Sequence, residues 1–416
     1  MKHFKISLVS IFIFVSVCLT KGNPAGDDFG TSVEISAYEK MPRYKGISQL
    51  ATAVRPGWKI GSHFSASSYG KTSTGDKEKI FEIFKANYNI LNAGIYMPQL
   101  MREKGIMKFD QTDEIVDFAQ KNNIDVYFHP LIGGVQYTAP WVNNSNFTKE
   151  ELQVIMRDWI KSVLTRYKGK VKYVDVVNEA LSGMQPDGVQ FKWKSGWKED
   201  RSDKNVWLET MGMYQGKKIV FPNYFVDAFR IAREFGGSDC KLIYNEWGNA
   251  TTKSSKGLAV FNLIKAMKEE GIPVDGVGIQ LHCAIKDGKF FEDPGSVKQQ
   301  PFDFEAFDKM LGMYQQAGID VHITEFDIHL SKDPAEADFE LQGRMYAEIV
   351  KHAIQSPAVK TFKSWGVCDK YSWQPKQYNA KPLIWDENFI PKPAYKSQVE
   401  MLTLMLKAKN KSFLIQ

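Results

Sequence analysis

Two glutamates follow apolar runs that have the length and composition of buried strands. Glu179 ends the sequence YVDVVNE, and Glu325 comes directly after VHIT. Two carboxylates on opposite sides of a sugar ring can cleave a glycosidic bond, because one protonates the leaving oxygen while the other attacks or activates water. A single glutamate after a strand is more often a solvated loop residue or half of a salt bridge. The interpretation therefore depends on the residues around the pair.

Polar residues end or follow the other apolar runs in the same way. They are His63, His129, Asn178, Asn245 with Glu246, Gln280 with His282, Asp327 and Trp365. If these runs are parallel strands of one barrel, their carboxyl ends share one face, and the polar groups gather there. Two carboxylates among amides, histidines and a tryptophan are difficult to explain as isolated loop residues.

A metal site is the competing interpretation of one segment. His322, Glu325, Asp327 and His329 are all possible ligands. His322 and Glu325 are three residues apart on a predicted strand, so they point to opposite faces. We therefore expect no catalytic metal and no other cofactor, and we expect His322 to lie in the core or face a helix.

Short apolar runs alternate with longer amphipathic stretches along the chain. The predicted strands are Trp58–Phe64, Tyr88–Leu91, Asp125–Phe128, Tyr173–Val177, Leu242–Asn245, Val277–Leu281, Val321–Thr324 and Thr361–Val367. The predicted helices include Asp113–Asn122, Glu150–Tyr167, Tyr224–Glu234, Leu258–Glu270, Phe304–Gln316 and Ala337–Gln355.

This alternation implies parallel strands joined by right-handed crossovers. Eight such units predict an α/β fold, a (β/α)8 TIM barrel, with its active site at the carboxyl ends of the strands. An open doubly wound sheet is the alternative, but no G-x-G-x-x-G follows any of the strands.

The first residues have the pattern of an export signal. Met1–Lys5 carries two lysines, and the apolar run Ile6–Leu19 is shorter than the roughly 20 residues of a transmembrane helix. We expect a signal peptide over residues 1–22, an N-terminal arm over 23–45 and a single catalytic domain over 46–410. Cys18 could accept a lipid, but Val17 before it is larger than such a site prefers. The mature protein is predicted to be secreted, periplasmic or on the cell surface.

Composition excludes several other classes of protein. The 416 residues are 43% hydrophobic and 25% charged, as in globular proteins. Without the three lysines of the signal segment the net charge falls from +6 to +3, and no basic block interleaved with aromatic residues predicts nucleic-acid binding. No later apolar run could span a membrane. We expect a monomer in which Cys240, Cys283 and Cys368 are buried thiols.

Five segments resemble the retaining endo-β-1,4-xylanases of glycoside hydrolase family 10. Four of them are VDVVNEAL (Val174–Leu181), GVGIQLH (Gly276–His282), ITEFDI (Ile323–Ile328) and WGVCDKYSW (Trp365–Trp373). PLIWDENFIPKPAY (Pro382–Tyr395) resembles the family's closing segment. All five occur in the family's order, and the likeness runs from Lys59 to Leu406.

The resemblance implies a role for individual residues. Glu179 matches the general acid/base and Glu325 the nucleophile, with carboxyl groups about 5–5.5 Å apart if the enzyme retains configuration. His282 and Asp327 match the pair that orients the nucleophile. The substrate-binding matches are Asn178, which would bind the sugar 2-hydroxyl at the −1 subsite, and His129, Gln280, Asn245, Trp365 and Trp373.

The resemblance is lost in segments that bind sugars of the glycone subsites in the family. The family's T-P-E-N-E-M-K-W is NAGIYMPQL (Asn92–Leu100) here, so that three polar sugar contacts are replaced by Gly94, Ile95 and Pro98. The family's G-H-T-L-V-W-H is FHPLIGG (Phe128–Gly134), and its N-D-Y-N is Asn245–Gly248. Glycines at 133 and 134 replace a tryptophan and a histidine, which predicts space for a bulkier or substituted sugar. The residues that could form a new wall are Tyr96, Tyr137, Trp141, Trp193 and Trp197.

These features predict a secreted, retaining glycoside hydrolase that cleaves internal β-glycosidic bonds of a plant-type polysaccharide, above all xylan. One alternative is a family 10-like β-glycosidase that acts on a decorated xylan or another β-glycan. The other is a catalytically silent glycan-binding protein, although such a protein has no need of Glu179, Glu325 and the His282–Asp327 pair. The expected partner is a polysaccharide or oligosaccharide, and neither nucleic acid nor a membrane span is expected.

Overall fold

The computed structural model describes residues 46–185, 190–195, 204–292, 301–331, 333–373 and 380–413. The predicted signal peptide and N-terminal arm lie outside these residues, as does Trp197.

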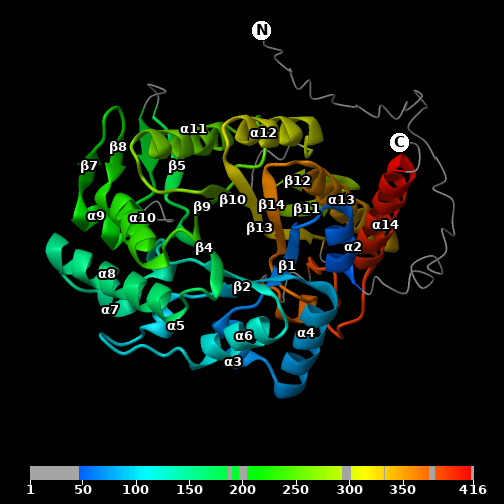
Figure 1. Cartoon of the computed structure of the whole chain (residues 1–416), viewed down its shortest axis with the longest axis horizontal. Helices are drawn as coiled ribbons and strands as arrows, with labels where there is room; N and C mark the ends of the chain where they lie inside the picture. Colours follow the sequence, from blue (N-terminus) through cyan, green and yellow to red (C-terminus); the bar gives the residue numbers. More distant parts are fainter. Residues whose placement is uncertain are drawn as a thin grey trace, which may run out of the picture. The chain divides into compact units, whose positions relative to one another are not determined.

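Eight parallel strands form a closed barrel (Figure 1). Each strand pairs with the next, and β14 pairs with β1 from Thr361–Lys59 to Ser364–Ser62, which closes the sheet. The strands are β1 (Lys59–His63), β2 (Ile90–Gly94), β3 (Asp125–His129), β4 (Val171–Asn178), β9 (Lys241–Trp247), β10 (Gly276–Gln280), β13 (Asp320–His329) and β14 (Val359–Ser364). All eight predicted strands and the predicted barrel are confirmed.

Helices surround this barrel (Figure 1). They are α2 (Ile47–Val54), α3 (Ala66–Lys71), α4 (Thr74–Asn87), α5 (Met97–Leu100), α6 (Asp110–Lys121), α7 (Pro140–Asn143), α8 (Lys149–Arg166), α9 (Val206–Met211), α10 (Asn223–Gly236), α11 (Ser255–Glu269), α12 (Phe304–Gln316), α13 (Glu336–Gln355) and α14 (Pro393–Phe413), with short 3-10 turns at Val135–Tyr137 and Asp369–Tyr371. The six predicted helices are confirmed. The long helix α14 was not predicted, because its apolar residues lie on more than one face: Leu402 is buried while Leu404 is exposed.

Three hairpins add to the barrel and were not predicted, because strands of three to five residues show little periodicity. They are β5 (Leu181–Met184) with β6 (Phe191–Trp193), β7 (Met213–Gln215) with β8 (Val220–Pro222), and β11 (His282–Lys286) with β12 (Lys289–Glu292). Strand β11 also pairs with the end of β13, His282 opposite Asp327. This pairing extends β13 to His329, so Glu325 lies within the strand, whereas the sequence placed it just after the strand.

The interior of the barrel is polar as well as apolar. Tyr127 donates its hydroxyl to Oδ1 of Asp175 at 2.6 Å. The Lys363 ammonium lies 3.5 Å from the centre of the Tyr127 ring and 3.0 Å from the hydroxyl of Thr361. His322 is also buried here, its Nδ1 3.0 Å from the same hydroxyl, which confirms it as a core residue. Burial lowers the pKa of Lys363 to about 7, although the negative charges of Asp175 and Glu325 oppose the shift.

The three predicted thiols Cys240, Cys283 and Cys368 are buried. Within the described ranges no helix has both the length and the apolar character needed to cross a membrane.

Candidate active site

The predicted site residues come together at the carboxyl ends of the barrel strands. His129, Asn178 and Gln280 are the last residues of β3, β4 and β10. Glu179 follows β4 directly, and Glu325 lies in β13. Hydrogen bonds connect most of these side chains. The fold therefore brings into one site residues that are up to about 200 positions apart in the sequence.

Two side chains fix the orientation of the Glu325 carboxyl group. Asn245 donates Nδ2 to its Oε1 at 2.8 Å, and Nε2 of His282 lies 3.2 Å from its Oε2. The other ring nitrogen of His282 lies 2.8 Å from Oδ1 of Asp327. Burial would lower the pKa of His282, but the charges of Asp327 and Glu325 raise it to about 10. The imidazolium therefore donates to the carboxyl groups of Asp327 and Glu325, and it fixes the orientation of Glu325.

The carboxyl group of Asp327 holds His282 in place and is itself contacted by two further side chains. Burial would raise the pKa of its carboxyl, but His282 and His329 hold it well below the usual range. Trp373 donates its indole N–H to Oδ2 at 2.8 Å, and Nε2 of His329 lies 3.1 Å from Oδ1. His282, Asp327 and His329 have ligand atoms within 4.8 Å of one another, close enough to hold a metal ion. Such an ion would compete for His282 nitrogens that already face Glu325 and Asp327.

Glu179 lies in a different environment. Its φ of 57° places it in the left-handed region, and its N–H donates to the carbonyl of Asn245 at 3.0 Å. Gln280 donates Nε2 to Oε1 at 3.1 Å, and the Lys194 ammonium lies 3.5 Å from Oε2. Burial raises the pKa of Glu179, Lys194 lowers it, and the charges of Glu246 and Glu325 raise it again. A carboxyl with a raised pKa suits a proton donor.

A chain of amides connects the two glutamates. Oδ1 of Asn178 accepts from Gln280 at 3.0 Å and from Asn245 at 2.9 Å. These two amides also donate to Glu179 and Glu325 respectively. Nδ2 of Asn178 is buried and has no acceptor among the described residues, which leaves a donor for a ligand. Asn245, predicted to bind substrate, is completely buried and supports Asn178 and Glu325, so its contact with a sugar stays a prediction.

His129 and the tryptophans line the same site. Nδ1 of His129 lies 2.8 Å from Asp175, and its Nε2 lies 3.9 Å from Oε1 of Glu325. Trp365 stacks on His63 with ring centres 4.0 Å apart and meets His129 edge-on at 5.1 Å. Trp373 is 52% exposed, which leaves half of this side chain available to a ligand.

The space predicted beside Gly133 is occupied, and that expectation was wrong. A Cβ at Gly133 would lie 2.4 Å from the ring of Tyr137, which fills the position. Tyr137 stacks on Tyr96 at 5.7 Å and meets His129 edge-on at 6.0 Å. Burial, followed by the charges of Glu179 and Glu325, raises the pKa of Tyr137 well above its usual value. Two tyrosines therefore form a wall beside both glutamates.

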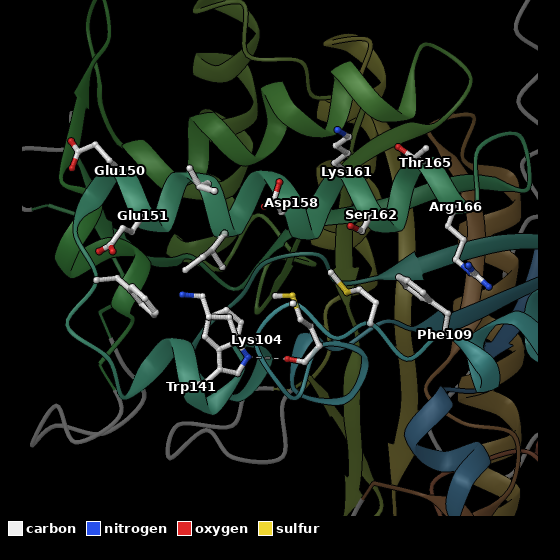
Figure 2. A pocket seen from close by; sticks show the side chains of 16 residues that line it. Lys104, Phe109, Trp141, Glu150, Glu151, Asp158, Lys161, Ser162, Thr165 and Arg166 are labelled. Atoms are coloured by element: carbon white, nitrogen blue, oxygen red, sulfur yellow. Dashed lines mark hydrogen bonds between the residues drawn. The ribbon is translucent and has the colours of Figure 1, made fainter.

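Trp141 and Trp193, the other candidates for that wall, donate their indole N–H groups to backbone carbonyls. Trp193 donates its indole N–H to the carbonyl of Val220 at 3.2 Å. Trp141 donates to the carbonyl of Met101 at 3.0 Å, at the edge of a groove of about 870 Å³ between α8 and the segments around residues 101–109 and 141–147 (Figure 2). None of the predicted site residues lines this groove.

Sequence reasoning missed Lys194. No motif contains it, and 15 residues separate it from Glu179 in the sequence. The only available signal was a lysine between aromatic residues shortly after the VDVVNEAL segment, which is too common to single out.

A closed (β/α)8 barrel with two buried carboxyl groups at one end, one oriented by an imidazolium and one with a raised pKa, is an arrangement suited to glycoside hydrolysis. The model of glycosyl hydrolase family 10 matches residues 50–401. Endo-1,4-beta-xylanase B of Thermotoga neapolitana is 31% identical over 340 residues, 80% of this chain and 86% of the relative. The chain belongs to glycosyl hydrolase family 10.

Solved structures agree with this assignment. Native xylanase 10B from Thermotoga maritima superimposes with a TM-score of 0.71 and 30% identity, over 87% of this chain and 99% of the other. Xylanase 10B from Thermotoga petrophila RKU-1 in complex with xylobiose has the same TM-score and identity, over 87% and 98%.

Proposed function

We propose that this protein is a retaining endo-β-1,4-xylanase. The carrying observation is the different surroundings of two buried carboxyl groups: His282, paired with Asp327, orients Glu325, whereas burial and nearby negative charge raise the pKa of Glu179. The xylanase relatives and the xylobiose complex support xylan as the substrate. Retention follows from the roles that the family motifs imply for the two residues.

In the first step Glu325 attacks the anomeric carbon while Glu179 gives its proton to the glycosidic oxygen, and that C–O bond breaks. This step leaves a glycosyl ester on Glu325 and a carboxylate at Glu179. In the second step water attacks the same carbon, Glu179 takes the water's proton, and the ester bond to Glu325 breaks. Two inversions give a product with the original β configuration.

The remaining residues would position the sugar. The buried Nδ2 of Asn178 offers a hydrogen bond to the 2-hydroxyl, a contact that strengthens as positive charge develops on the ring. Trp365, Trp373 and Tyr137 present aromatic faces, which suit the C–H faces of pyranose rings.

A family 10-like enzyme for a decorated xylan or another β-glycan is the second candidate. Tyr96 and Tyr137 occupy the side where the family's charged and amide contacts are missing. An unmodified xylan chain loses those contacts, each typically worth about 1–3 kcal/mol. The tyrosine wall favours apolar over polar recognition of the sugar there.

We further propose that the protein is exported and works as a monomer. The basic n-region and apolar run of residues 1–22 support export. Mass measurement of the N-terminus after expression in a secreting host tests the cleavage, and light scattering tests the monomer.

The decisive experiment measures product release from a panel of linear and decorated xylans and other β-glycans, with Glu325→Ala as the control. Proton NMR of the fresh product then reports its anomeric configuration. β-Xylo-oligosaccharides from linear xylan, absent in the variant, support the first proposal. Activity restricted to another glycan supports the second candidate, and an α-anomeric first product contradicts retention.

A further inference from the structure

The hairpin that follows Glu179 returns the chain to the same glutamate. Strands β5 and β6 pair with Leu181 opposite Trp193. The backbone N–H of Lys194 then donates to the carbonyl of Ala180 at 2.8 Å. Lys194 is therefore fixed beside the residue that directly follows Glu179, and its ammonium lies 3.5 Å from Oε2 of Glu179. The register of the hairpin, and not a chance side-chain conformation, produces this pair.

The hairpin is itself anchored to the barrel. The N–H of Leu181 donates to Oε2 of Glu246 at 3.1 Å, and Trp193 is tied to Val220. Oε1 of Glu246 pairs with Lys256 at 2.9 Å. The Lys194 and Glu179 side chains are only 12% and 9% exposed, so solvent screens their interaction weakly.

The two oxygens of Glu179 have different neighbours. Oε1 accepts the amide N–H of Gln280 at 3.1 Å. Oε2 faces the Lys194 ammonium, which donates to it at 3.5 Å. When the proton of the acid moves to the leaving oxygen, a negative charge appears next to the Lys194 ammonium. Burial lowers the pKa of Lys194 to about 8, and the charges of Glu179 and Glu246 oppose this shift.

Other charges surround Glu179. Glu246 and Glu325 make its ionisation less favourable, and Lys194 makes it more favourable. Lys256 acts on Glu246, and His282 acts on Glu325. Tyr137 is neutral at ordinary pH, because its pKa is raised well above its usual value. Lys194 is the cation nearest to Oε2 among these groups.

We propose that Lys194 is a positioning residue that holds Oε2 of Glu179 and stabilises the carboxylate formed by proton transfer to the leaving group. The inference rests on the proposed function, because it requires Glu179 to be the acid/base. Lys194 should help proton transfer to a poor leaving group, and it should also lower the pH at which Glu179 ceases to act as an acid.

The test compares Lys194→Met and Lys194→Arg with Lys192→Met, which removes an exposed charge from the same hairpin. The pH dependence of kcat/KM is measured on linear xylo-oligosaccharides and on a dinitrophenyl xylobioside, whose leaving group needs no proton. For Lys194→Met on the oligosaccharides we expect the alkaline limb to move up by about one pH unit, the usual effect of removing an adjacent opposite charge. The arginine variant should restore the wild-type limb, and Lys192→Met should leave it unchanged.

Thermal unfolding of each variant shows whether it folds, and Lys194→Gln replaces the methionine variant if that one does not. An alkaline limb that stays in place, or moves down, in a folded variant without the Lys194 charge overturns the inference. An equal shift on the dinitrophenyl substrate also overturns it, because that reaction does not need the acid. A wild-type protein that cleaves no glycan contradicts the proposed function itself, which separates the two failures.

Discussion

The two carboxyl groups proposed to act in catalysis are buried to a similar degree and have different surroundings. Glu325 receives two side-chain hydrogen bonds, one from an imidazolium that Asp327 keeps charged. Glu179 accepts one hydrogen bond from an amide and one from the Lys194 ammonium. The negative charges of Glu246 and Glu325 lie near it. Burial raises the pKa of Glu179, and His282 orients Glu325, so their surroundings favour the proposed roles of Glu179 as proton donor and Glu325 as nucleophile.

The largest effect is expected at the nucleophile. Glu325→Ala should lower kcat/KM on xylan on the order of 10⁴-fold or more, because no other described carboxylate takes the oriented position in β13. Steady-state kinetics measure the loss, with Glu305→Ala, an exposed position on α12, as the control. Retention of even a tenth of the activity would show that another group attacks.

Glu179→Ala should cost about 10²–10⁴-fold on xylo-oligosaccharides, the usual range for a lost general acid. On a dinitrophenyl xylobioside the first step should be nearly unaffected, because that leaving group departs without a proton. Burst kinetics on the two substrates measure the difference. An equal loss on both substrates would contradict the role of Glu179 as the proton donor.

Asp327→Asn should lower kcat/KM roughly 10- to 100-fold, the rate equivalent of about 1–3 kcal/mol for a disrupted buried network. His282 would lose the charge that keeps it protonated, and Glu325 would lose its oriented donor. Asp308→Asn is the matched control, since Asp308 pairs with His352 at the surface. Equal effects of the two substitutions would contradict a special role for the buried pair.

The smallest effect concerns stability. The pKa of His282 is raised to about 10 in the folded state, so its contribution is complete below about pH 6.5 and is lost as the pH rises through 10. Calorimetry should show Tm falling by a few degrees more in the wild type than in Asp327→Asn over this interval. Parallel curves for the two proteins would mean that Asp327 does not raise the pKa of His282.

The barrel could be predicted from the sequence because each of its strands is a short apolar run with a polar residue at its end. Glu179, Gln280, His282 and Asp327 could be predicted because they lie in ordered motifs. Each of these motifs combines an apolar strand with the polar residues that follow it, so the motif locates the end of the strand.

Contacts that depend on the paths of loops could not be predicted. The ring of Tyr137 fills the space beside Gly133 only because a 3-10 turn folds it back four residues later. Lys194 reaches Glu179 through the register of a short hairpin. The full length of β13 depends on β11, a strand about 40 residues earlier in the chain.

The left-handed backbone of Glu179 places a local steric cost at the position of the proposed acid. Glycine adopts such a φ without steric cost, whereas a longer side chain there costs on the order of 1 kcal/mol. Replacing Glu179 with glycine would also remove a buried carboxyl that lies near other negative charges. The same change would take from Lys194 and Gln280 their acceptor at Glu179, which opposes both gains. In a descendant released from selection for hydrolysis, substitutions at positions 179, 194 and 280 should therefore accompany one another as a sign that catalysis had been abandoned.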